Sequence, residues 1–165
     1  MKLIKKTSTI LVVVLIVMQF FRPTKNINNG ASALNNDISK VLNVPANVQL
    51  ILQTSCYDCH SNNSKYPWYA SVQPIAWWHN HHIEEGKEEI NFNEFANYRL
   101  RRQYRKLQEI VTQVKQDEMP MGSYTLIHKN ATLAAEQKNT LINWATANMD
   151  SMKLKYPLDS LIKKS

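Results

Sequence analysis

The sequence has very little glycine and very little cysteine. Only three of its 165 residues are glycine, and only two are cysteine. No stretch alternates apolar and polar residues between turn dipeptides, as the strands of a β-sheet would. These absences exclude a disulfide-rich scaffold and favour a mostly helical, all-α domain.

Both cysteines lie in one short motif, Cys56-Tyr57-Asp58-Cys59-His60. This CxxCH spacing is typical of covalent haem attachment, in which each thiol forms a thioether with a former vinyl group and the histidine binds the iron. We therefore expect Cys56 and Cys59 to hold one haem c and His60 to be the proximal iron ligand.

Two other kinds of site also use closely spaced cysteines. A structural zinc site needs further ligands, and the chain offers only His79, His81, His82 and His128. A thioredoxin-like redox pair follows a buried strand in a βαβ pattern. The residues from Val48 to Ser55 instead show the apolar spacing of a helix. Both alternatives are therefore less favoured than haem attachment.

The first 21 residues have the pattern of an export signal. Lysines at positions 2, 5 and 6 precede an apolar run from Ile10 to Phe21 that only Gln19 interrupts. Small residues at positions 31–33 resemble a cleavage site, but they lie far beyond the apolar run. We therefore expect an uncleaved transmembrane signal anchor in the inner (cytoplasmic) membrane, with cleavage as the alternative. The lysines predict a cytoplasmic N-terminus and a periplasmic remainder.

Composition divides the chain into four segments. Residues 1–21 form the anchor, and the asparagine-rich residues 22–43 are expected to be a polar tether with little to bury. Residues 44–150 are long enough for one small core, to which a buried porphyrin would add apolar surface. Residues 151–165 are expected to be a basic tail.

Four helices are expected in the folded segment. Gly86 is expected to end the second helix as its C′ residue, and Asn93 is expected to cap the start of the third. The helices are expected from Ala46 into the CxxCH motif, from about 71–74 to 86, from 93 to about 116, and from about 133 to 149.

The second iron ligand determines the chemistry of such a haem. Met119 is the main candidate, because its separation from His60 is similar to that in small class I cytochromes c and Pro120 would stiffen its loop. Methionine opposite histidine raises the reduction potential, which suits an electron carrier. Met121 is a fallback, and His82 is the principal rival, either as a ligand or as a propionate contact.

Aromatic residues are dense just after the motif. A haem pocket needs an apolar wall and hydrogen-bond donors for the propionates, so Trp68 and Tyr69 are expected to contact the cofactor. Other members of the group are Tyr66, Trp77 and Trp78. Among the remaining histidines, His79 and His81 are expected to face solvent, and His128 to order the loop after Met119.

The formal net charge is +7, and part of it is concentrated on the third expected helix. This basic segment is either a solvated helix face or a docking surface for an acidic redox partner protein or an anionic membrane. Nothing in the sequence suggests a nucleic-acid partner. The segment consists of Arg99, Arg101, Arg102, Arg105 and Lys106.

Several short stretches together resemble a known family. The chain resembles the haem-binding domain found in many Bacteroidota envelope proteins, over most of the region from Pro45 to Asn148. The resemblance implies a membrane-tethered, cytochrome c-like domain with a single haem. Relatives commonly place a serine cap before the last helix where this chain has Ala134, so Thr132 is the alternative cap. The stretches are residues 56–63, 66–69, 82–87, 90–92, 118–120 and 124–128.

These observations predict a membrane-anchored periplasmic c-type cytochrome that cycles its iron between ferric and ferrous states and transfers single electrons. Enzymatic turnover is less favoured. The alternative is a peroxidase-like or gas-binding haem protein with an open or displaceable distal ligand, in which His82 would act as acid and base. A purely structural or haem-sensing module is the third possibility.

Overall fold

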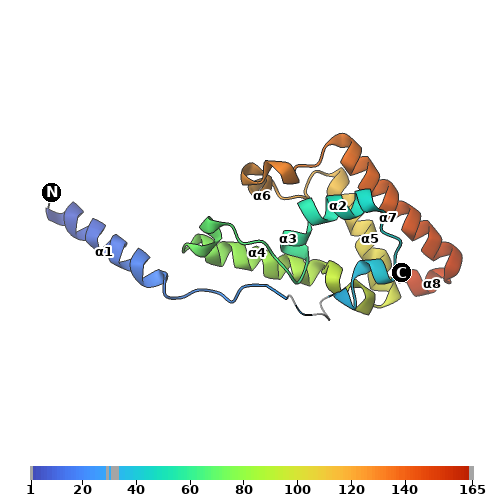
Figure 1. The fold of residues 1–165 in the computed structure, drawn as a ribbon, viewed down its shortest axis with the longest axis horizontal. Helices are drawn as coiled ribbons and strands as arrows, with labels where there is room; N and C mark the ends of the chain where they lie inside the picture. Colours follow the sequence, from blue (N-terminus) through green and yellow to red (C-terminus); the bar gives the residue numbers. More distant parts are fainter. Residues whose placement is uncertain (1, 29, 31–33, 164–165) are drawn as a thin grey trace.

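The computed structural model describes residues 2–28, 30 and 34–163. Within these residues the regular structure is helical, apart from one isolated antiparallel bridge between Ile27 and Asn63 (Figure 1). The all-α prediction is therefore confirmed. The α-helices are α1 Lys2–Met18, α2 Ala46–Ser55, α3 Tyr57–His60, α4 Ile75–Glu89, α5 Leu100–Lys115, α6 Gly122–Ile127, α7 Ala135–Lys155 and α8 Leu158–Leu161. Short 3₁₀ helices are η2 Ile38–Lys40, η3 Trp68–Ser71, η4 Phe92–Asn97 and η5 Lys129–Ala131.

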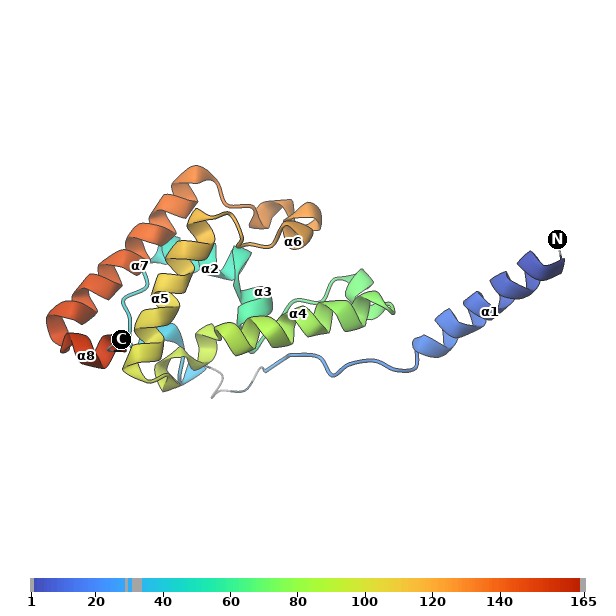
Figure 2. The same ribbon diagram turned by 180° about the vertical axis from the view of Figure 1, so that it is seen from behind.

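The core lies where α5 and α7 pack side by side, with α2 against them (Figures 1 and 2). Tyr104 and Leu107 of α5 and Leu141 and Trp144 of α7 are buried, at the helical spacing that the sequence shows. Each such side chain stabilises the fold by roughly 1.5–3 kcal/mol relative to exposure. This α5–α7 pair is the rigid wall against which the candidate site is built.

The predicted polar tether is partly wrong, because its end is folded into the domain. Ile38 is fully buried in the core. Next to it, Asp37 accepts hydrogen bonds from the amide of Ser39 at 3.0 Å and from the Asn93 side chain at 2.9 Å. The asparagines of this segment predicted a solvated chain, yet the side chain of Asn26 donates to the carbonyl of Ser61 at 2.8 Å.

The predicted basic tail is wrong up to residue 161. Helix α7 continues to Lys155, and Met152 and Leu161 are both buried in the core. Helix α8 packs on α5, where Arg101 donates to the carbonyl of Asp159 at 2.7 Å. Lys153 and Lys155 are exposed, and their charge gave no sign that Met152 and Leu161 are core residues.

Two predicted helix ends are also wrong. Helix α4 passes through Gly86 and ends at Glu89. Asn93 caps no helix: it is buried, and Asn91 accepts from its amide at 3.1 Å at the start of η4. Helix α5 begins only at Leu100.

The start of α7 differs from the expected one. Ala134 is the N-cap residue, so Thr132 does not replace the missing serine. The side chain of Gln137 reaches back and accepts from the Ala134 amide at 2.9 Å. This contact satisfies the backbone group that a capping box would satisfy.

The N-terminal helix α1 has no buried residue and projects away from the domain (Figures 1 and 2). Across the part of the chain that the structure describes, no helix combines the length and the apolar character needed to cross a membrane. The alternative cleavage site at residues 31–33 lies outside the described residues.

Replacing Ile38 with alanine tests whether the segment before residue 44 is part of the fold. Because Ile38 is fully buried, we expect Ile38→Ala to lower the free energy of unfolding by about 2–5 kcal/mol, measured by urea denaturation at equal haem content. Leu34→Ala is the matched control, since Leu34 is 58% exposed. Equal stability of the two variants would show that the segment is a loose tether.

Candidate functional site

The CxxCH motif lies at the junction of two helices. Helix α2 buries Val48, Ile51, Leu52 and Ser55, which confirms the helical spacing predicted before the motif. Cys56 ends α2, and the single turn of α3 carries the rest of the motif. The ring of Tyr57 stacks on Phe92 with centroids 5.2 Å apart. The motif is thus held against the core on both sides.

Both cysteines are free, half-buried thiols. Burial raises the pKa of Cys56 to about 12 and that of Cys59 to about 11. A catalytic redox pair needs a lowered thiol pKa, because the thiolate is the nucleophile. These environments therefore do not suit a thioredoxin-like pair.

His60 has a defined tautomer. Its Nδ1 lies 2.7 Å from the carbonyl oxygen of Gly86 and 3.0 Å from that of Ile90. Carbonyls only accept, so Nδ1 carries the hydrogen and Nε2 presents its lone pair. Burial lowers the pKa of His60, which keeps the ring in the neutral form that metals bind. Metal-binding histidines in general are oriented in this way, by a hydrogen bond from the ring nitrogen that does not bind the metal.

Gly86 makes this contact possible. A Cβ atom built on Gly86 would lie 2.9 Å from the backbone oxygen of Cys59. Any larger residue would push α4 away from the motif and move the Gly86 carbonyl away from His60. Gly86 was predicted to end α4, but it lies within the helix and allows close packing against Cys59.

A cavity of about 460 Å³ opens beside the motif. This volume lies within the roughly 300–1,000 Å³ of ordinary ligand pockets. The structure brings together six residues that the sequence proposed for the haem site, from three separate segments of the chain. They are Cys56, Cys59, His60, His82, Met119 and Met121. The apolar part of the wall includes Leu52, Ile90, Phe92, Ile110, Val114 and Leu141.

Met119 lies in the loop between α5 and α6, as predicted. The backbone turns there through Asp117, which has a φ of 59°. The amides of Glu118 and Met119 both donate to the carbonyl of Gln113, at 3.0 and 3.3 Å. The last turn of α5 therefore fixes where the Met119 loop leaves the core.

A hydrogen bond joins the Met119 loop to the CxxCH motif. The hydroxyl of Tyr124 in α6 donates to a carboxylate oxygen of Asp58 at 2.7 Å, and both residues line the cavity. Burial and this hydrogen bond raise the pKa of Tyr124, so the phenol stays a donor. Tyr124 was not predicted to be a site residue, because no local sequence pattern indicates a contact with Asp58, which lies 66 positions away.

His128 ties the same loop to a third segment. Its Nδ1 bonds the carbonyl of Tyr124 at 3.1 Å, so its Nε2 is the acceptor for the Tyr69 hydroxyl at 2.9 Å. The ring of His128 also stacks on that of Tyr124, with centroids 4.2 Å apart. His128 thus takes part in ordering the loop, as expected from the sequence.

The structure does not place the aromatic residues predicted for the haem pocket at the cavity. Trp68 is 80% exposed, and neither Trp68 nor Tyr69 lines the cavity. Phe92 and Tyr124 take that place. Closeness to the motif in sequence did not predict which aromatic residues line the cavity, because no residue of η3 is part of its lining. The other three aromatics of that group, absent from the cavity lining as well, are Tyr66, Trp77 and Trp78.

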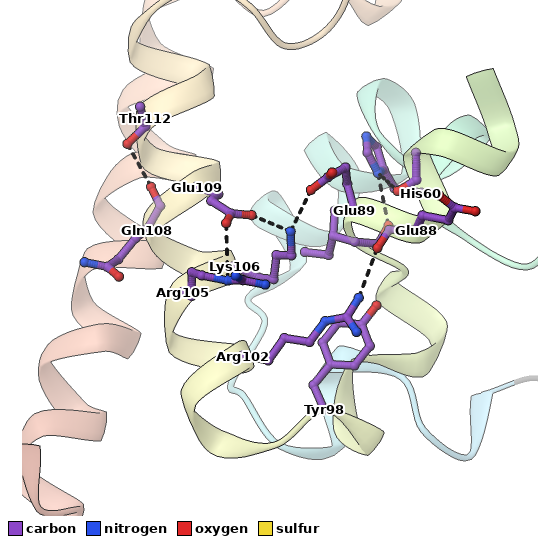
Figure 3. A network of polar contacts seen from close by, with 12 residues as sticks. His60, Glu88, Glu89, Tyr98, Arg102, Arg105, Lys106, Gln108, Glu109 and Thr112 are labelled. Atoms are coloured by element: carbon purple, nitrogen blue, oxygen red, sulfur yellow. Dashed lines mark hydrogen bonds and ion pairs between the residues drawn. The ribbon is translucent and has the colours of Figure 1, made fainter. Parts of the chain in front are cut away.

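The basic segment on α5 is not a uniform solvated face. Lys106 is 3% exposed and lines the cavity, with its ammonium 2.8 Å from Glu89 and 2.5 Å from Glu109 (Figure 3). Arg102 lies over the ring of Tyr98 and donates to the carbonyl of Glu88 at 3.0 Å (Figure 3). Lys106 and Arg102 therefore fasten α5 to the end of α4, while Arg101 fastens it to α8 through the carbonyl of Asp159.

The histidines of α4 differ in their surroundings. His81 is exposed and pairs with Glu85 at 3.1 Å. His79, in contrast to the prediction, is half-buried against Tyr66, and its Nδ1 is buried without a hydrogen-bond partner among the described residues. Within the described ranges no three His, Cys, Asp or Glu side chains gather in a way that could hold a metal ion. This finding gives the zinc alternative no support.

A family model described as a haem-binding domain matches residues 13–147. The chain belongs to the haem-binding domain family. Comparison with curated proteins and with solved structures gave no match. In this haem-binding domain the cavity fits the group: two thiols and a neutral imidazole with a free Nε2 meet at an apolar wall.

Replacing Gly86 with alanine tests the packing of α4 on the motif. In an ordinary helix this change would stabilise by about 1 kcal/mol. Here the added methyl meets a backbone oxygen, so we expect the free energy of unfolding to fall by about 1–3 kcal/mol and the haem-to-protein ratio to fall with it. Gly122→Ala is the control, since nothing lies within 4 Å of its added Cβ. A stabilising Gly86→Ala would contradict the account.

Proposed function

We propose that this haem-binding domain is a c-type electron-transfer protein with a cytochrome c-like role. Cys56 and Cys59 would hold one haem covalently, and His60 and Met119 would be its iron ligands. The observation that carries the proposal is the single cavity that Cys56, Cys59, His60 and Met119 line together. When bound, such a haem supplies an iron that exchanges one electron between its ferric and ferrous states.

The side chains around the cavity have simple roles in this function. His60 holds its proton on Nδ1 and offers Nε2 to the metal. Met119 offers a thioether, which favours ferrous iron and a higher potential. The apolar wall keeps water from the metal, and Phe92 packs edge-on against the His60 ring with centroids 6.2 Å apart. No bound substrate is needed.

We further propose that the N-terminal segment up to Phe21 attaches the protein to the cytoplasmic membrane, with the cavity on the periplasmic side. Three lysines followed by apolar residues support this location, and so do the exposed apolar side chains of α1. Redox proteins with acidic surfaces are the proposed partners, because Arg99, Arg101 and Arg105 remain exposed on α5.

A second candidate function rests on His82. His82 lines the same cavity and lies 3.2 Å from a carboxylate oxygen of Glu85. An imidazole paired with a carboxylate can move a proton at a cavity wall. If Met119 left the metal site open, this arrangement would suit peroxidase-like or gas-binding chemistry.

The experiment that separates these functions compares two variants of the metal site. In the oxidised wild type we expect a low-spin spectrum with the weak long-wavelength band of sulfur ligation. Met119→Ala should abolish the band, lower the reduction potential within the ~0.8 V range that axial ligands span, and admit carbon monoxide. His82→Ala should leave the band unchanged. If Met119→Ala left the spectrum unchanged and His82→Ala made the haem high-spin, the result would establish bis-histidine ligation instead.

The hydrogen bond between Tyr124 and Asp58 should hold the Met119 loop over the cavity. Tyr124→Phe removes a bond worth about 1.5–3 kcal/mol, so we expect at least a roughly tenfold larger fraction of protein without the sulfur band at a given temperature. Asp58→Asn keeps an acceptor oxygen and should retain most of the band.

Tyr156→Phe is the control for this experiment, because Tyr156 is half-buried and lies outside the cavity lining. An unchanged spectrum in Tyr124→Phe would show that the loop needs no such contact.

A further inference from the structure

One end of the domain exposes several large apolar side chains. They belong to η3 and the first turn of α4, which lie at the end of the domain that points toward α1 (Figures 1 and 2). We call this group the aromatic tip. Trp68 is 80% exposed and Trp78 is 49% exposed, although tryptophan is usually well buried. The tip consists of Trp68, Val72, Ile75, Trp77 and Trp78.

The end of α1 is fastened to this tip by hydrogen bonds. The side chain of Gln19 accepts from the amide of Gln73 at 2.9 Å. The side chain of Gln73, which is 3% exposed, donates to the carbonyl of Phe21 at 2.7 Å. The indole of Trp77 donates to the same carbonyl at 2.8 Å. The chain therefore leaves α1 at the tip, and the exposed rings of Phe20 and Phe21 extend the same apolar end.

The segments that form α1 and the tip carry positive charges but no carboxylates. Residues 1–36 contain no aspartate or glutamate, and neither do residues 59–83. Arg22, Lys25 and Lys65 are all exposed. The tip is therefore an apolar surface near positive charges, and the segments that form it contain no carboxylates. Such a surface complements an anionic lipid surface.

We propose that the aromatic tip inserts into the interfacial layer of an anionic phospholipid bilayer beside α1. The inference rests on the membrane attachment proposed above. Tryptophan prefers this layer, because its ring is apolar while its indole N–H can still donate. Three of the four tryptophans of the chain lie in the tip, and the fourth, Trp144, is in the core. Two contacts, α1 and the tip, would fix the orientation of the domain, so the haem cavity would face a constant direction above the membrane.

Photoreactive lipids test this proposal on the full chain. The haem-loaded protein is reconstituted into vesicles of phosphatidylethanolamine and phosphatidylglycerol that contain a phospholipid with a photoreactive group near its headgroup. After flotation and illumination, adducts are mapped by mass spectrometry. We expect adducts on residues 2–21 and on residues 68–78. Leu154 at the end of α7 and Leu158 in α8 provide an internal control, because they are 91% and 57% exposed and these elements lie at the end of the domain opposite to the tip (Figure 1).

A pair of variants sharpens the result. Trp68→Glu should reduce adducts on residues 68–78 severalfold without changing the haem spectrum, since Trp68 does not line the cavity. Leu154→Glu, at a residue that is 91% exposed, should change neither the adducts on residues 68–78 nor the haem spectrum. Protein that fails to float would refute the attachment itself. Flotation without adducts on the tip would overturn the proposal alone and leave the tip as a surface for a protein partner. Equal adducts on α8 and on the tip would also overturn it.

Discussion

The site depends on the contact between the His60 imidazole and the carbonyls of Gly86 and Ile90. This contact fixes the tautomer and direction of the ring, and it requires the end of α4 to lie directly on the CxxCH turn. Only a residue without a Cβ allows that approach, since a Cβ at position 86 would lie 2.9 Å from the backbone oxygen of Cys59. The ion pair between Lys106 and Glu89 then holds α5 to the same end of α4, so one packing arrangement sets both the imidazole and a wall of the cavity.

The opposite wall is built differently, from a loop rather than from helix packing. The amides of Glu118 and Met119 are tied to α5 through Gln113, and Tyr124 reaches across to Asp58. A methionine on such a loop is positioned by a few hydrogen bonds. In the proposed function, the packed His60 side would hold a fixed ligand, and the hydrogen-bonded Met119 side would hold a displaceable one.

Local patterns in the sequence predicted the parts of the structure that local chemistry determines. The buried face of α2 and the all-α class follow from residue type and period. Met119 was proposed as a ligand from its sequence separation from His60, and the structure places both residues at the same cavity. The errors concern contacts between distant segments: Trp68 and Tyr69 lie near the motif in sequence but outside the cavity. Ile38, Met152 and Leu161 are core residues within polar stretches, because one buried side chain per turn is enough to fix a segment while its neighbours stay polar. The meeting of Tyr124 with Asp58 has no local signal at all.

The central claim is that Cys56 and Cys59 carry a covalently bound haem. The most direct measurement is haem staining after denaturing electrophoresis of protein that was exported in a host with a haem-maturation system. The account predicts that the wild type retains its haem, that the double variant Cys56→Ser, Cys59→Ser loses it, and that His60→Ala keeps the stain while its spectrum changes. Loss of the haem from the wild type on denaturation would contradict the account.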